Sequence, residues 1–135
     1  MEVIYLDGET LTRQQIERIV HGRAQVKLAE KAKEKVLKSR NRIEAQLQNG
    51  AVIYGVNTGF GQLATIRIQD EDNDLLQLNL LRSDATGVGE PFPIEVVRAM
   101  MILRANALAR GYSGIRLETL ELLLALINEH VTPVV

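Results

Sequence analysis

A tyrosine within a glycine-rich stretch is the residue of this chain best suited to chemistry. Residues 53–61 read Ile-Tyr-Gly-Val-Asn-Thr-Gly-Phe-Gly. The Tyr54 hydroxyl can donate or accept a proton, and Gly55, Gly59 and Gly61 let the backbone adopt positive φ angles and bend sharply. We expect either a loop that moves Tyr54 toward a ligand, or a plain turn after a short strand with Tyr54 half-buried. The stretch is not a nucleotide-binding loop, because no lysine follows the last glycine and the spacing differs from the dinucleotide fingerprint.

Residues 54–61 also resemble the tyrosine loop of the aromatic amino acid ammonia-lyases, most of all histidine ammonia-lyase. Three more blocks resemble that family in the same order, at 80–91, 108–116 and 128–135. The resemblance covers most of the chain from Val52 onward. It implies a mostly α fold, the N-terminal part of the fumarase/aspartase-like helical fold of these lyases, with a short N-terminal strand and glycine-rich loops.

The resemblance also implies a reaction and a set of site residues. Members of that family eliminate ammonia from an aromatic amino acid, in the histidine-type enzymes from L-histidine to urocanate. They use an electrophile, 4-methylidene-imidazol-5-one, formed from an internal Ala-Ser-Gly, together with a loop tyrosine as base and no metal. Carried over by position, Tyr54 is that base, Gly55 and Gly59 are hinges of its loop, and Gly61 and Asp84 bind substrate. The pKa of a free tyrosine is about 10, so nearby hydrogen-bond donors or positive charge must favour the phenolate.

Two features depart from the family pattern. Histidine ammonia-lyases usually carry histidine at the position of Asp84, and an ionised carboxylate only accepts hydrogen bonds. Asp84 is expected to accept from a ring N–H of histidine, to favour another substrate, or merely to satisfy backbone donors in its turn. In addition, residues 1–135 contain no Ala-Ser-Gly. We therefore expect an N-terminal ammonia-lyase-like domain over 1–135, truncated before the cofactor-forming segment and inactive alone.

Composition bounds the location and the partners. The chain of 135 residues is 46% apolar and 24% charged, as expected for one globular domain. Its net charge of −1 provides no field for nucleic acid or an anionic membrane. There is no cysteine, no signal-peptide pattern at the start, and no apolar run long enough to span a membrane. We expect a cytoplasmic protein that acts on a small amino acid, without nucleic-acid or membrane partners.

The hydrophobic pattern predicts a mostly helical chain. A strand at 3–6 and a turn at Asp7 precede a helix capped by Thr10 or Thr12 and ended by His21. Further helices are expected at about 24–49, 72–83, 93–110 and 117–129. Lysine and arginine on the second of these helices are expected to face solvent, because no nucleic-acid motif accompanies them. The acidic run at 70–74 lacks the glycine and glutamate of a calcium loop and is expected to open a helix.

Apolar residues cover several sides of the three later helices. The helix at 72–83 carries five leucines, and such a helix is buried within the chain or by association. Family members are homotetramers with active sites shared between subunits, so the resemblance implies a homo-oligomer. The alternative to an enzyme portion is a non-catalytic helical interaction domain, or a truncated paralogue that assembles with a longer partner.

Overall fold

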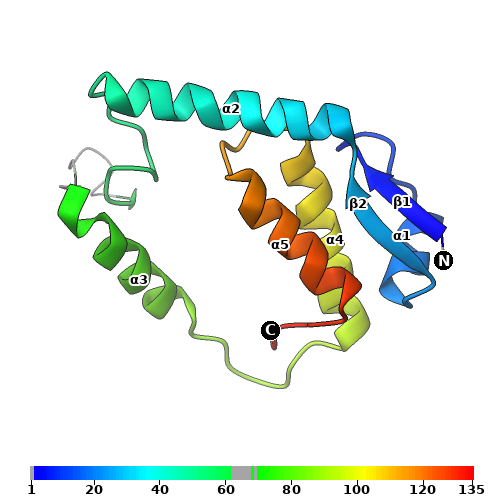
Figure 1. Ribbon diagram of the computed structural model, residues 1–135. Coiled ribbons are helices and arrows are strands. Elements are labelled where there is room, and N and C mark those ends of the chain that lie inside the picture. Colours follow the sequence, from blue (N-terminus) through cyan, green and yellow to red (C-terminus); the bar gives the residue numbers. More distant parts are fainter. Residues whose placement is uncertain (1, 62–67, 69) are drawn as a thin grey trace. The chain divides into compact units, whose positions relative to one another are not determined.

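The computed structural model describes residues 2–61, 68 and 70–135 (Figure 1). The chain divides into two compact units, Met1–Ile43 with Glu90–Val135, and Glu44–Gly89. The described residues are mostly helical with one pair of short strands, so the predicted fold class is confirmed. Among them, no helix is both long and apolar enough to cross a membrane.

Two parallel strands, β1 (Glu2–Leu6) and β2 (Ala24–Leu28), form the sheet of the first unit. Their register pairs Glu2 with Ala24 at one end and Leu6 with Leu28 at the other. The connection between them contains helix α1 (Arg13–Val20). Thr12 caps this helix, since its hydroxyl accepts from the Gln15 N–H while the Gln15 side chain accepts from the Thr12 N–H. The predicted cap and the predicted end at His21 are both confirmed.

The predicted helical start at Ala24 is wrong. Residues 24–28 form β2, and the helix that follows them, α2, spans Glu30–Gln48. Alanine, lysine and leucine are good helix formers, so local propensity favoured a longer helix. However, Ala24, Val26 and Leu28 alternate with more exposed residues and bury one face of the strand. Pairing with β1 satisfies the backbone of both strands, and this tertiary gain overrides the local preference.

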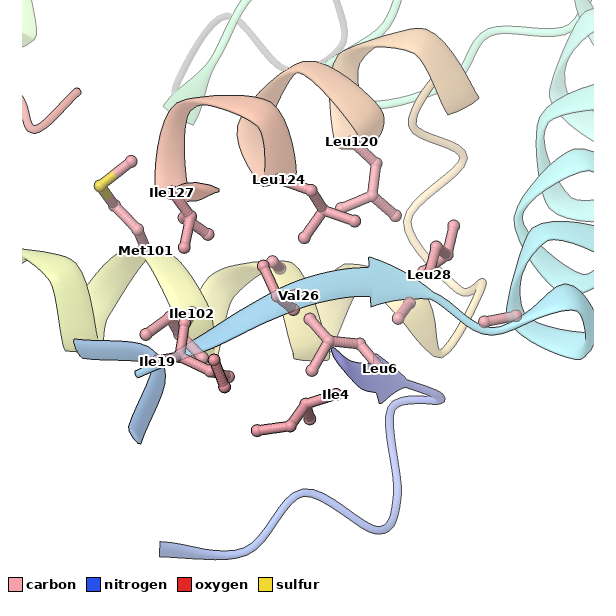
Figure 2. Close-up of a cluster of buried hydrophobic side chains, with 14 of the residues drawn as sticks. Ile4, Leu6, Ile19, Val26, Leu28, Met101, Ile102, Leu120, Leu124 and Ile127 are labelled. Atoms are coloured by element: carbon pink, nitrogen blue, oxygen red, sulfur yellow. The ribbon is translucent and has the colours of Figure 1, made fainter. Parts of the chain in front are cut away.

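Two helices pack over the sheet to form the core of the first unit: α4 (Ile94–Ala109) and α5 (Leu117–Asn128). Figure 2 shows Leu120, Leu124 and Ile127 of α5 directed toward Val26 of β2. Ile102 of α4 packs in the same cluster. Each fully buried side chain of this size stabilises the fold by about 1.5–3 kcal/mol. The predicted bounds of α5, 117–129, agree closely with those observed.

Arg98 of α4 binds the C-terminal end of α1. Its Nε donates to the Val20 carbonyl at 2.8 Å and its Nη2 donates to the Ile19 carbonyl at 3.0 Å. The side chain is 3% exposed, and desolvation lowers the pKa of its guanidinium. Carbonyls at a helix C-terminus lack intrahelical partners and carry partial negative charge. Arg98 therefore fixes α1 to α4 through the last carbonyls of the helix, of which that of Ile19 also accepts from the Gly22 N–H.

The second unit contains the end of α2, the tyrosine loop, a short 3₁₀ helix at Asp70–Asp72 and helix α3 (Asn73–Asp84). Leucines on α3 at positions 75, 78 and 81 are exposed. The sequence predicted that this helix is buried either within the chain or by association. Burial within the chain is wrong for these three side chains. Burial by association remains a prediction.

Candidate active site

Tyr54 lies at the start of a tight turn in the second unit. The Ile53 carbonyl accepts from the Val56 N–H at 3.1 Å and from the Asn57 N–H at 3.2 Å, which closes the turn. Gly55 has a φ of +72°, where a side chain would be strained. The Tyr54 side chain is 63% exposed. Tyr54 is thus exposed on the turn, in contrast to the half-buried alternative.

Asn57 stabilises the turn through hydrogen bonds to its backbone. Its Oδ1 accepts from the Ile53 N–H at 2.8 Å, and its Nδ2 donates to the Ala51 carbonyl at 2.9 Å. The residue is 5% exposed, so these bonds form away from bulk water. The Asn57 carbonyl also accepts from the Ile68 N–H at 3.1 Å, which joins the turn to the returning chain.

Thr58 stabilises the loop on the C-terminal side of Tyr54. Its hydroxyl accepts from the Gly55 N–H at 3.2 Å and donates to the Gly59 carbonyl at 2.9 Å. With 1% exposure it is the most buried polar side chain of the loop. Both the donor and an acceptor site of the hydroxyl are therefore in use.

Phe60 contacts the Tyr54 ring. The two ring centroids lie 5.8 Å apart with planes at 70°, an edge-to-face arrangement that aromatic pairs favour. A Cβ added at Gly55 would lie 3.4 Å from Phe60 Cε1, an ordinary contact, so the positive φ and not the ring is the reason for glycine here. The sequence analysis did not single out Asn57, Thr58 or Phe60. Asparagine and threonine often form hydrogen bonds with the nearby backbone, and this tendency could have indicated the roles of Asn57 and Thr58.

The structure brings Tyr54, Gly55, Gly59 and Gly61 together in one loop. Gly59 is buried, whereas Gly61 is exposed with a φ of +58°. Asp84 is the last residue of α3 and is exposed, with its Oδ1 3.4 Å from the Ser83 hydroxyl. Across the described residues, no hydrogen bond or ion pair joins Asp84 to the loop. Over the same part of the chain, no three His, Cys, Asp or Glu side chains converge to hold a metal ion.

Comparison with known proteins identifies the family. The family model for aromatic amino acid lyases matches residues 11–135. The chain belongs to this family. It is 51% identical to a histidine ammonia-lyase of Anaeromyxobacter dehalogenans, over the whole of this chain and 27% of the relative. It thus spans about a quarter of the length of the relatives that it matches.

Solved structures of aromatic amino acid lyases share the fold. A tyrosine aminomutase from Streptomyces globisporus superposes with a TM-score of 0.89 and 37% identity, over 98% of this chain and 25% of that chain. A histidine ammonia-lyase from Trypanosoma cruzi gives a TM-score of 0.83 and 36% identity, over 95% and 25%. The described residues therefore share the fold of the N-terminal portion of members of this family.

The family uses an electrophilic cofactor that forms from its own chain. Members of the family depend on 4-methylidene-imidazol-5-one. That group forms from Ala-Ser-Gly, a sequence that does not occur within residues 1–135. Among the described residues, Tyr54 is an exposed residue whose hydroxyl is able to bind or transfer a proton.

Proposed function

We propose that this chain carries the catalytic base of an ammonia-lyase that converts L-histidine to urocanate, and that Tyr54 is that base. The observation that carries the proposal is the exposed Tyr54 hydroxyl on a braced glycine turn, in a chain 51% identical to a histidine ammonia-lyase. Gly55 and Gly59 are the proposed hinges of the loop, and Gly61 and Asp84 are the proposed substrate contacts.

The proposed role of Tyr54 is to remove a proton from the substrate's Cβ. The Tyr54 phenolate takes the proton, the electron pair of the C–H bond forms the Cα–Cβ double bond, and the C–N bond breaks with its pair on the departing ammonia. Such a proton is barely acidic, so the base must be unprotonated and correctly placed when substrate is bound. Residues 1–135 contain no Ala-Ser-Gly, and we assign only the proton-abstracting part of the reaction to this chain.

Asp84 is proposed to bind the ring of the substrate. Its exposed carboxylate is able to accept a hydrogen bond from an imidazole N–H. A phenol hydroxyl satisfies the same acceptor, and one structural relative is a tyrosine aminomutase. Tyrosine is therefore the second candidate substrate.

A chimeric enzyme tests the catalytic proposal. Residues 1–135 replace the matching segment of the Anaeromyxobacter dehalogenans relative, with the unaltered relative as the control. We expect the chimera to release ammonia from histidine and Tyr54→Phe to lower kcat at least a thousandfold, about 4 kcal/mol of transition-state stabilisation. The matched variant Tyr112→Phe, which alters an exposed tyrosine in the first unit, should retain the activity of the chimera. If Tyr54→Phe stays within tenfold of the chimera, Tyr54 is not the base.

A second candidate function is non-catalytic assembly. The exposed leucines of α3 favour it, since they offer an apolar helix face for a partner. An inactive chimera, together with self-association of the 135-residue chain, would support this candidate over the enzyme. For the enzyme too, we propose that it is a homo-oligomer in the cytoplasm, without nucleic-acid or membrane partners. We expect the 135 residues alone to release no ammonia.

A further inference from the structure

We propose that Thr58 and Asn57 are positioning residues that set the direction of the Tyr54 side chain for catalysis. The inference rests on the proposed function of Tyr54 and extends it to two side chains that bind the backbone of its loop. Both are buried, both are polar, and all four of their recorded side-chain bonds go to the backbone of the loop.

The two peptide groups that flank the Tyr54 Cα are both held. The carbonyl of the peptide before it, that of Ile53, accepts two backbone N–H groups. The N–H of the peptide after it, that of Gly55, donates to the Thr58 hydroxyl. Because φ and ψ of Tyr54 are the rotations between these two peptide groups, fixing both fixes the direction in which its side chain leaves the backbone.

Asn57 holds the chain that enters the turn. Its carboxamide bridges the Ala51 carbonyl and the Ile53 N–H, so two successive peptide groups ahead of Tyr54 are bound by one side chain. An open loop of this composition would lose considerable conformational entropy on presenting Tyr54 in one direction. The braces remove most of that loss before substrate binds, which is the advantage of a preorganised site.

Substitutions of Thr58 test the proposal more specifically than those of Asn57. Valine has the shape of threonine without its hydroxyl, so Thr58→Val leaves the Gly55 N–H and the Gly59 carbonyl without their partner. Serine keeps the hydroxyl and loses only a methyl group. For Asn57 the matched change is Asn57→Asp, which retains an acceptor for Ile53 but places negative charge against the Ala51 carbonyl.

Hydrogen exchange on the 135-residue chain tests the brace without any activity. In Thr58→Val we expect the Gly55 amide to exchange at least tenfold faster than in the parent, while the amide of Ile102 in the core of the first unit is unchanged. Thr58→Ser should restore slow exchange at Gly55. Equal exchange at Gly55 in the parent and in Thr58→Val would overturn the inference, because the bond would then not order the loop.

Kinetics of the chimera test the consequence for catalysis. We expect Thr58→Val to lower kcat about ten- to a hundredfold with KM within threefold, as misplacement of a catalytic group does. Thr58→Ser should recover at least a third of the parent kcat, and the thermal midpoints of both variants should lie well above the assay temperature. A Thr58→Val enzyme with parental kcat, beside an inactive Tyr54→Phe enzyme, overturns the positioning role alone. An active Tyr54→Phe enzyme overturns the proposed base instead, and with it the catalytic consequence proposed for Thr58.

Discussion

Asn128 binds both outward-facing backbone groups of Val26. The Val26 N–H donates to Asn128 Oδ1 at 2.8 Å, and Asn128 Nδ2 donates to the Val26 carbonyl at 2.9 Å. This side chain of α5 therefore takes the place of a third strand at the edge of the sheet. Sheet edges with free N–H and C=O groups invite pairing with other chains, and Asn128 closes this edge at its centre while fixing α5 to β2.

Asn128→Ala should lower the free energy of unfolding by about 2–3 kcal/mol. The change leaves two backbone groups of the buried Val26 without partners, at a typical cost of about 1–3 kcal/mol for each buried unsatisfied group. Urea denaturation followed by circular dichroism measures the effect. Glu129→Ala alters the neighbouring exposed residue and serves as the control, with an expected change within about 0.5 kcal/mol. Equal midpoints for the two variants would contradict the edge-closing role.

Gly111→Ala should destabilise the chain strongly. A Cβ at this position would lie 2.6 Å from the backbone carbon of Lys35 and 2.8 Å from its carbonyl oxygen. Gly50 has nearly the same φ, +77° against +75°, but nothing lies within 4 Å of its Cβ position. Gly50→Ala therefore reports the left-handed strain alone, about 1–2 kcal/mol. In thermal unfolding we expect Gly111→Ala to lose clearly more, and a loss no greater than that of Gly50→Ala would show that Lys35 moves away freely.

Asp7 should make the folded chain less stable in acid. Hydrogen bonds from the backbone of Thr10 and of Glu9, then from the Thr10 hydroxyl, lower the pKa of Asp7 from 3.8 to about 2. These bonds favour the ionised carboxylate, so its contribution is fully present above pH 3.8 and is lost as the pH falls through about 2. The group is largely exposed, and solvent screening keeps the effect small.

Asp7→Asn should therefore flatten the fall of the thermal midpoint between pH 4 and 2. Asparagine keeps an acceptor oxygen but has no charge to lose in this range. Glu90→Gln removes an exposed carboxylate elsewhere in the chain and is expected to leave the slope of the parent. An identical slope for Asp7→Asn and the parent would show that Asp7 does not contribute.

The 135-residue chain should self-associate at micromolar concentration through α3. Leu75, Leu78 and Leu81 are 53%, 43% and 68% exposed, and they recur at three-residue spacing on the helix. Light scattering should show dimers or larger assemblies, and the double change Leu78→Glu with Leu81→Glu should shift the chain toward monomer. Asn79→Glu adds charge at an exposed polar position of the same helix and is the control. A parent chain that remains monomeric would rule out α3 as an assembly face.

Asp84→His in the chimera should shift substrate preference toward histidine. The change supplies an imidazole that is able to donate as well as accept, so it is able to share a proton with an imidazole substrate. We expect the ratio of kcat/KM for histidine over tyrosine to rise at least tenfold, about 1.4 kcal/mol. Steady-state kinetics on histidine, tyrosine and phenylalanine measure it. An unchanged ranking would mean that position 84 does not read the substrate ring.

Local sequence was sufficient for several features of the helices. The Thr12 cap, the end of α1 at His21 and the bounds of α5 depend on residues within a few positions of one another. The glycines around Tyr54 indicated a loop, and Gly55 and Gly61 do adopt positive φ angles. The role of Tyr54 as base came from the family resemblance and stays a prediction.

Tertiary structure decided the features that depend on partners distant in sequence. Residues 24–28 are a strand because β1 lies beside them, and the buried Arg98 donates to the carbonyls at the C-terminal end of α1. The bonding of Asn57 and Thr58 could not be predicted from the sequence either, since the glycine-rich stretch around them indicated only a loop. Whether an amide or hydroxyl faces water or the backbone depends on how the chain folds around it, and burial makes the backbone bond the favoured one. The sequence thus determined which residue carries the hydroxyl, whereas packing decided how Tyr54 is held and presented.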